Sequence, residues 1–200
     1  MARRVFFSFY HYEDEDKQKL NRIWVVRNSW VTKGTFESAG FIDAAEYEKI
    51  KRQGNEAIKK WIIEQLNGTS VTVVLIDYET YLRPWVRYEI VKSFDKGNGQ
   101  LGVYIHQIKD LKGNTEPKGE NPFEYLMLSI DNDGKAKYYE LVGNNWRLFD
   151  KYPNCSLNFD KEYGKNYKFS EMYKIYDWMY DDGYNNLGDW IEKAAGQFRR

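Results

Sequence analysis

A tryptophan and a glutamate four residues apart are the residues best placed to do chemistry in this chain. Trp85 and Glu89 follow the apolar run 71–76, and residues at i and i+4 share one face of a helix. A helix that follows a buried parallel strand starts at the carboxyl edge of its sheet, where open α/β sheets bind ligands. The pair therefore marks a candidate ligand site.

Glu89 lies beside an apolar stripe and not opposite it. Val86, Ile90 and Phe94 stand at i, i+4 and i+8, so this stripe is expected to pack on the sheet. A carboxylate next to it is semi-buried and rigidly held. The alternative is a solvated glutamate that pairs with Lys92 three residues further on.

Three loops should converge with this helix at the same edge of the sheet. They span residues 10–14, 43–51 and 77–84, and they supply Tyr10, His11, Tyr12, Asp43 and Tyr81 around Trp85 and Glu89. An aromatic cleft with few amides and one carboxylate suits a cationic or planar ligand better than a bare phosphate.

Several other chemistries lack their residues. His11 and His106 are the two histidines and are far apart in sequence, and Cys155 is the lone cysteine. A single cysteine excludes an internal disulfide and a multi-cysteine metal site. The residues also give no support for a Ser/His/Asp or Cys/His catalytic set, and we expect no metal. Neither Gly-x-Gly-x-x-Gly nor a P-loop motif is present.

The composition of the chain limits the classes of molecule that it is expected to bind. The 200 residues hold 30 basic and 30 acidic side chains, so no net field attracts nucleic acid or an anionic membrane. No stretch reaches the roughly 18 apolar residues of a membrane-spanning helix, and the N-terminus lacks a signal-peptide core. With a single cysteine, this predicts a cytoplasmic protein that binds neither nucleic acid nor membrane.

The first half of the chain alternates strand and helix patterns. Residues 4–9, 70–76 and 101–105 read as buried strands, and residues 41–43 as the end of a short one. Helical patterns start near Leu20 and cover 55–66 and 84–96, with a polar loop through Lys51. This alternation predicts an α/β fold with a flavodoxin-like parallel sheet flanked by helices.

The second half changes character after a long loop at 109–121. Short β-type runs at 125–130, 136–142 and 146–149, separated by turn signals, predict an antiparallel meander. Met172, Ile175, Tyr176 and Met179, and later Leu187, Trp190 and Ile191, predict one or two amphipathic helices. We expect an α/β domain over residues 1–128 and a meander with C-terminal helices over 129–200, packed on the same domain.

Two segments carry a family resemblance. The run Arg4-Val5-Phe6-Phe7-Ser8-Phe9 resembles the opening D-V-F-I-S-Y strand of TIR domains, and Trp85-Val86-Arg87-Tyr88-Glu89 resembles their W-C-x-x-E helix motif, with Val86 in place of cysteine. Residues 25–33, 69–72, 121–123, 176–178 and 181–185 extend the similarity to the TIR-like ThsB family of the bacterial Thoeris anti-phage system. The resemblance covers nearly the whole chain.

This resemblance implies an NAD nucleosidase of the ADP-ribosyl cyclase type, a hydrolase acting on N-glycosyl bonds. Such an enzyme cleaves NAD at the nicotinamide glycosidic bond after sensing a phage component. It makes a cyclic ADP-ribose isomer, and this messenger activates a separate NAD-depleting effector. NAD is then a substrate, no cofactor is required, and a homo-oligomer is an open option.

By motif match, Glu89 takes the position of the catalytic glutamate. The predicted substrate-binding residues are Phe9, Tyr10, His11, Asp43, Trp85 and Tyr88. Loss of nicotinamide passes through an oxocarbenium-like state that one ionised carboxylate can stabilise. Glu89 would be charged at neutral pH unless burial shifts its pKa. Aromatic walls from Phe9, Tyr10 or Trp85 would favour cyclisation over attack by water.

The sequence also leaves other functions open. The loop 43–47 lacks the Arg-Asp and Pro-Gly residues of many signalling TIR domains, which argues against their usual loop-mediated assembly. A non-catalytic TIR-like module that senses a phage component or recruits a partner is the main alternative. A flavodoxin-class nucleotide-binding regulator is less favoured, because Ser8-Phe9-Tyr10 stand where its acidic pocket would lie.

Overall fold

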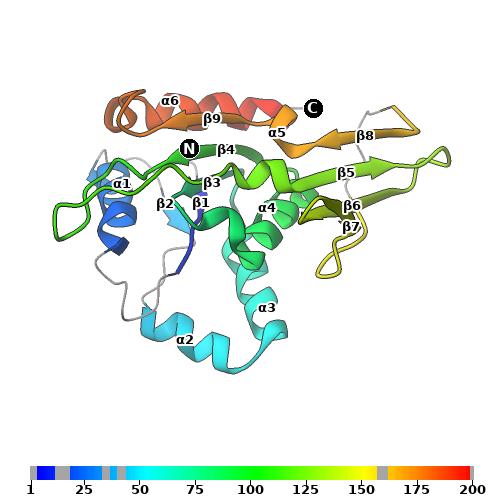
Figure 1. Cartoon of the computed structure of the whole chain (residues 1–200), viewed down its shortest axis with the longest axis horizontal. Helices are drawn as coiled ribbons and strands as arrows, with labels where there is room; N and C mark the ends of the chain where they lie inside the picture. The colour runs from blue at the N-terminus through cyan, green and yellow to red at the C-terminus, as the bar shows by residue number, and fades with distance from the viewer. Residues whose placement is uncertain (1–3, 12–18, 33–36, 40–43, 157–161, 199–200) are drawn as a thin grey trace.

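A five-stranded parallel sheet organises the molecule (Figure 1). The computed structural model describes residues 4–11, 19–32, 37–39, 44–156 and 162–198. The strands, in the spatial order β2-β1-β3-β4-β9, are β1 (Arg4–Ser8), β2 (Glu37–Ala39), β3 (Val71–Ile76), β4 (Gly99–Tyr104) and β9 (Lys174–Asp177). Every pair in this sheet is parallel. The order confirms the predicted flavodoxin-like fold.

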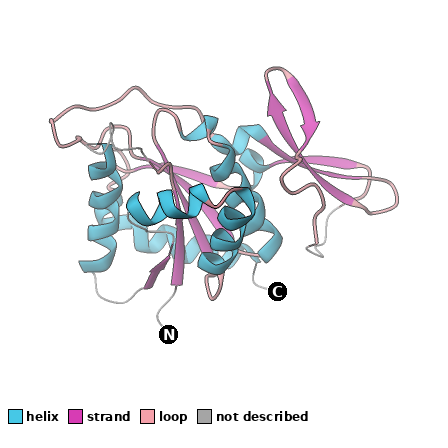
Figure 2. Ribbon diagram, turned by 90° about the horizontal axis from the view of Figure 1, so that it is seen from below, coloured by secondary structure: helices cyan, strands magenta, loops and turns pink. Residues whose placement is uncertain are grey.

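Helices cover both faces of this sheet, as Figure 2 shows. α1 (Leu20–Thr32) and α6 (Gly183–Ala195) pack on one face, and α3 (Asn55–Leu66) and α4 (Pro84–Lys96) pack on the other. α6 lies very close to β4, because a Cβ added at Gly99 would come within 1.9 Å of the Ala194 carbonyl oxygen. The result is a three-layer α/β/α arrangement with an apolar core on each side of the sheet.

α4 has the bounds that the sequence predicted. Pro84 occupies its first turn, and Gly97 ends it in the left-handed region with φ 82°, which glycine adopts without a steric penalty. The Gly97 N–H donates to the carbonyl oxygens of Phe94 and Ser93. The helix carrying Glu89 is therefore well defined at both ends.

A second, antiparallel sheet extends from the first. Its order is β7-β6-β5-β8, formed by β5 (Leu126–Ile130), β6 (Ala136–Val142), β7 (Asn145–Leu148) and β8 (Lys165–Lys168). This confirms the predicted meander and adds β8, which was not predicted. The β6–β7 hairpin projects from the body of the molecule (Figure 2).

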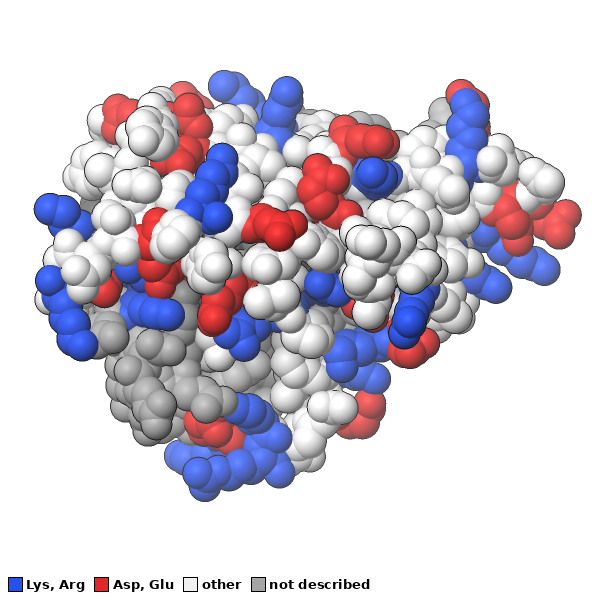
Figure 3. Space-filling model, in the orientation of Figure 1, with Lys and Arg blue, Asp and Glu red and all other residues white. Residues whose placement is uncertain are grey.

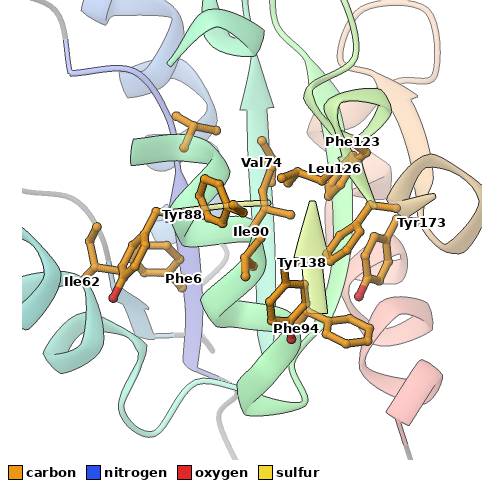
Figure 4. Close-up of a cluster of buried hydrophobic side chains, with 14 of the residues drawn as sticks. Phe6, Ile62, Val74, Tyr88, Ile90, Phe94, Phe123, Leu126, Tyr138 and Tyr173 are labelled. Carbon is orange, nitrogen blue, oxygen red and sulfur yellow. The ribbon is translucent and has the colours of Figure 1, made fainter. Parts of the chain in front are cut away.

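One apolar cluster joins the two sheets (Figure 4). Phe6 and Val74 of the first sheet, Ile90 of α4 and Tyr138 of β6 belong to it. Phe123, in the short 3₁₀ helix η3 (Pro122–Tyr125), is completely buried within it. The domain boundary expected after residue 128 stays a prediction. Residues on both sides of it, such as Ile90 and Tyr138, pack in this same cluster.

Two predicted elements were wrong. The segment around Ile175 and Tyr176 was expected to be helical but forms β9, because it pairs with the free edge of β4. It is too short for the spacing of its apolar residues to distinguish a helix from a strand. Residues 44–52 were expected to be a polar loop but form α2 (Ala44–Arg52). The predicted strand end at 41–43 lies outside the described residues, while β2 precedes it.

Smaller elements complete the chain. They are the 3₁₀ helices η2 (Thr80–Leu82) and η4 (Gly196–Phe198) and the short helix α5 (Phe169–Met172). None of the helices in the described ranges is both long and apolar enough to cross a membrane. On the face drawn in Figure 3, acidic and basic side chains are interspersed, with basic residues gathered near α2.

Candidate active site

Glu89 is a buried carboxyl group at the carboxyl edge of the first sheet. Its side chain belongs to α4, and only 4% of the residue is exposed. Ser8, the last residue of β1, donates a hydrogen bond from Oγ to Glu89 Oε2 at 2.5 Å. The predicted position beside the apolar stripe is confirmed, since Val86, Ile90 and Phe94 are buried around it.

The alternative of a solvated ion pair with Lys92 is wrong. The Lys92 ammonium lies 3.7 Å from the Asp95 carboxylate and 4.0 Å from the centre of the Tyr152 ring. Glu89 instead faces the end of β1. Removal of a carboxyl group from water makes its ionisation costly.

Burial changes the protonation of Glu89. It raises the pKa of Glu89 to about 8, while the hydrogen bond from Ser8 opposes the shift. The carboxyl group is therefore mostly protonated at neutral pH in the ligand-free protein, contrary to the ordinary glutamate charge. A perturbed acid of this kind is a frequent mark of a functional site.

A cluster of rings lies within electrostatic range of this carboxyl group, because Glu89 influences the pKa of Tyr47. The His11 imidazole stacks on the Tyr47 ring, with centroids 4.1 Å apart and planes 13° apart. Phe9 lies 4.4 Å from His11 on a tilted plane, and Trp61 meets both His11 and Tyr47 edge-on at 5.9 Å. These four residues, from the end of β1, α2 and α3, are called the aromatic cluster below.

The rings keep His11 neutral. Although His11 retains some exposed surface, the loss of solvent around its imidazole lowers its pKa to about 3. It therefore acts as a flat, uncharged ring at physiological pH. Burial also raises the pKa of Tyr47, and the nearby charge of Glu89 adds to this shift, which connects the aromatic cluster electrostatically to the carboxyl group.

Tyr10 forms the outer side of this region. The Arg83 guanidinium lies 3.4 Å from the centre of the Tyr10 ring, a cation–π contact. Arg83 also pairs with Glu79 one turn earlier. Tyr10 is close enough to Tyr47 to influence its pKa. Of the predicted residues, Phe9 and His11 are thus joined to Tyr47 by ring contacts, and Tyr10 and Glu89 both lie within electrostatic range of Tyr47.

Three further candidates, Trp85, Tyr88 and Tyr81, have contacts of their own. Trp85 contacts Tyr88 edge-on at 5.7 Å, and the Lys151 ammonium lies 4.6 Å from the centre of its ring. Tyr88 is 2% exposed and lies beside Phe6 and Ile62 in the core (Figure 4). Tyr81 lies 5.3 Å from the Tyr125 ring. The predicted residues Tyr12 and Asp43 are outside the described residues.

Three residues of this region were missed by the sequence prediction. Ser8 was assigned only to a strand, Trp61 only to the apolar face of a helix, and Tyr47 to a polar loop. The signals for Tyr47 were weak, because α2 has few apolar residues. For Ser8, a hydroxyl that follows the apolar run Val5-Phe6-Phe7 was the available clue, since buried hydroxyls need a partner.

The arrangement points to a planar, positively charged ligand. One carboxyl group, poised between its protonated and ionised forms, stands beside rings that can stack on a planar group. Within the residues that the structure describes, three or more histidine, cysteine, aspartate or glutamate side chains do not gather as a metal site. The carboxyl group is therefore the candidate for the chemical role.

Comparison with known proteins identifies the family. Residues 6–110 match the sequence model of a family described as Thoeris protein ThsB, TIR-like domain. A protein of Bacillus cereus (strain MSX-D12) named "Putative cyclic ADP-D-ribose synthase ThsB1" is 44% identical over 195 residues, which cover 96% of this chain and 100% of that protein. On both grounds, the chain belongs to the ThsB family of Thoeris proteins with a TIR-like domain.

Proposed function

We propose that this protein is an anti-phage enzyme that cleaves NAD at the nicotinamide glycosidic bond and closes the ADP-ribosyl part into cyclic ADP-ribose or an isomer of it. The relative from Bacillus cereus is named as a cyclic ADP-ribose synthase and aligns over its whole length. The observation that carries the proposal is the buried Glu89 carboxyl group, held by Ser8 next to the aromatic cluster. NAD enters as substrate, and the reaction needs no cofactor.

The chemistry follows from the charge of the substrate. The nicotinamide ring of NAD carries a positive charge, so breaking the bond between ribose C1′ and the ring nitrogen releases neutral nicotinamide. The bonding electron pair leaves with nicotinamide, and positive charge develops on the ribose, as in glycosidases. The ionised Glu89 side chain would stabilise this charge at close range in a site with little water.

The raised pKa of Glu89 fits this role once substrate binds. A cation within a few ångströms favours the charged form of a carboxyl group, so the nicotinamide ring lowers the pKa of Glu89 and promotes loss of its proton. The protein without ligand keeps the group neutral. Binding of the correct cationic substrate would thus prepare the carboxylate that its reaction needs.

Cyclisation requires a nucleophile from the same molecule. A new bond forms between C1′ and an atom of the ADP part, and one proton is released, so NAD gives the cyclic product, nicotinamide and a proton. Exclusion of water by the rings near Glu89 would favour this step over hydrolysis to linear ADP-ribose. Phe9, Tyr10 and His11 are the residues we assign to that enclosure.

The biological setting is part of the same proposal. We place the reaction in the cytoplasm, with a phage component as the trigger and a separate NAD-depleting effector as the receiver of the messenger. Membership in the ThsB family supports this setting. The proposal also includes a homo-oligomer as the active form.

The test is a metabolite comparison in bacteria that carry the protein without its effector. Extracts from phage-infected and uninfected cells are analysed by mass spectrometry for a compound lighter than ADP-ribose by one water. We expect this compound only in infected cells that contain the protein. If linear ADP-ribose is the only new product, the protein is a simple NAD nucleosidase and not a cyclase. Unchanged NAD metabolites in these infected cells, together with phage protection of cells that carry both the protein and its effector, would favour a non-catalytic sensing module.

A further inference from the structure

Ser8 has a buried hydroxyl that donates a hydrogen bond to Glu89. The residue is completely buried at the last position of β1, and its Oγ donates to Glu89 Oε2 at 2.5 Å. Strand β1 lies beside β3 in the middle of the sheet, with Ser8 opposite Val74. The donor is therefore fixed to an interior strand of the sheet, which pairs with β2 on one side and β3 on the other.

Glu89 needs such a fixed donor. A glutamate side chain has three torsions, and burial near an apolar stripe supplies little direction to its polar end. A hydrogen bond to the charged form of a carboxyl group favours that form, and a bond from hydroxyl to carboxylate is among the stronger ones. Ser8 can thus both orient the carboxyl group and make its ionisation easier.

We propose that Ser8 is the positioning residue of Glu89: it holds Oε2 at the end of β1 and thereby presents Oε1 to the ribose of the substrate. This inference rests on the proposed function and assigns a role to a residue that does not itself touch the reacting atoms. Its effect should be seen in kcat and in the pH dependence more than in KM, because substrate binding would draw mainly on other contacts.

The same helix offers a matched control. Ser93 of α4 is also completely buried, and its Oγ accepts a hydrogen bond from the Thr72 hydroxyl at 2.7 Å. Ser8→Ala and Ser93→Ala therefore remove the same atom from equally buried sites on or beside α4. Only Ser8→Ala removes the hydrogen bond to Glu89.

The first measurement is independent of activity. The side-chain carboxyl carbon of Glu89 is followed by NMR titration in the wild-type protein, Ser8→Ala and Ser93→Ala. We expect the midpoint to move to higher pH in Ser8→Ala and to stay unchanged in Ser93→Ala. An unchanged midpoint in Ser8→Ala, or an equal shift in both variants, overturns the inference.

The second measurement uses NAD turnover. Ser8→Ala should lower kcat/KM at pH 7 by up to about tenfold for each unit by which the pKa of Glu89 rises in the free enzyme. It should also lower kcat, with KM changed little, because Oε1 is no longer directed at the ribose. Ser8→Thr should restore part of both losses because it keeps the hydroxyl. Equal kcat in Ser8→Ala and wild type contradicts the positioning role. The assay uses extracts of phage-infected cells, which supply the trigger. If wild-type protein lacks turnover there while the NMR shift occurs, the proposed function fails and the Ser8–Glu89 linkage stands.

Discussion

At the scale of residues, Glu89 is a carboxyl group placed where its charge is unfavourable. Burial raises its pKa to about 8, so the folded protein keeps a proton that the unfolded chain releases near its ordinary value. A buried acid with a raised pKa is expected where a protein keeps a group for catalysis at a cost in stability. Ionisation of Glu89 at high pH should therefore destabilise the folded state, so the free energy of unfolding should depend on pH.

The first prediction concerns stability against pH. Because the folded state binds one proton more than the unfolded state between about pH 4.5 and 8, the free energy of unfolding falls as pH rises through that window, by about 1.4 kcal/mol per unit. Glu89→Gln removes this dependence. Thermal melts should show a Tm gain for Glu89→Gln at pH 8.5 that vanishes near pH 4.5.

Glu64→Gln is the matched control for that experiment. Glu64 lies on α3 with 57% of its side chain exposed, so its replacement should change Tm little at either pH. A Tm difference between Glu89→Gln and the wild type that is the same at pH 4.5 and 8.5 would contradict the raised pKa.

The second prediction concerns the rate. If the reaction needs ionised Glu89 in the free enzyme, kcat/KM for NAD should rise with pH and level off above a midpoint near 8. The measurement is initial rates of nicotinamide release between pH 5.5 and 9.5. A profile that is already flat from pH 5.5 upward would mean that Glu89 titrates like an exposed glutamate or takes no part.

At the scale of elements, α4 is hydrogen-bonded to the segment between strands β7 and β8 of the second sheet. Asp95 near its end accepts hydrogen bonds from the Tyr152 hydroxyl at 2.6 Å and from the Ser156 N–H and hydroxyl at 2.6 and 2.7 Å. Burial raises the pKa of Asp95, but these bonds outweigh it and lower the pKa below its usual value. Nearer the start of α4, Arg87 pairs with Glu140 of β6 at 3.0 Å.

The third prediction tests the hydrogen bonds to Asp95. Asp95→Ala leaves several donors without an acceptor, so it should lower the free energy of unfolding by about 2–4 kcal/mol. Asp95→Asn keeps one acceptor oxygen and should lose less. Asp150→Ala, at an exposed position, serves as the control in urea denaturation. Equal stability of Asp95→Ala and wild type would show that these bonds contribute little.

The elements also show which parts of the fold were predictable. β1, β3 and α4 were predicted because each has a long, unambiguous pattern with clear end signals. β9 was not, because four residues cannot distinguish a strand from a helix, and its identity depends on pairing with β4. α2 was missed for a similar reason, and the contribution of Tyr47 to the site was missed with it.

At the scale of the whole molecule, the C-terminal part completes the first sheet. β9 covers the edge of β4, and α6 places Leu187, Trp190 and Ile191 against the same face as α1. The Tyr176 and Trp190 rings stack at 4.2 Å with planes 3° apart, which ties strand to helix. The sheet that positions β1 and α4 is therefore completed by segments from the C-terminal part of the chain.

The fourth prediction follows from this arrangement. A chain that ends at residue 128 lacks β9 and α6, so it exposes apolar surface on β4 and should not fold cooperatively. Circular dichroism and thermal melts of residues 1–128 against the full chain check this. A sharp melting transition of the shorter chain would mean that residues 1–128 form an independent domain.

The central claim is that Glu89 carries out NAD cleavage, and one comparison tests it most directly. Extracts of phage-infected cells containing wild-type protein, Glu89→Gln or Glu64→Gln are incubated with NAD, and nicotinamide and the cyclic product are measured by mass spectrometry. We expect both products with wild type and Glu64→Gln, and at least a hundredfold less with Glu89→Gln at equal protein levels. Undiminished products from Glu89→Gln would contradict it.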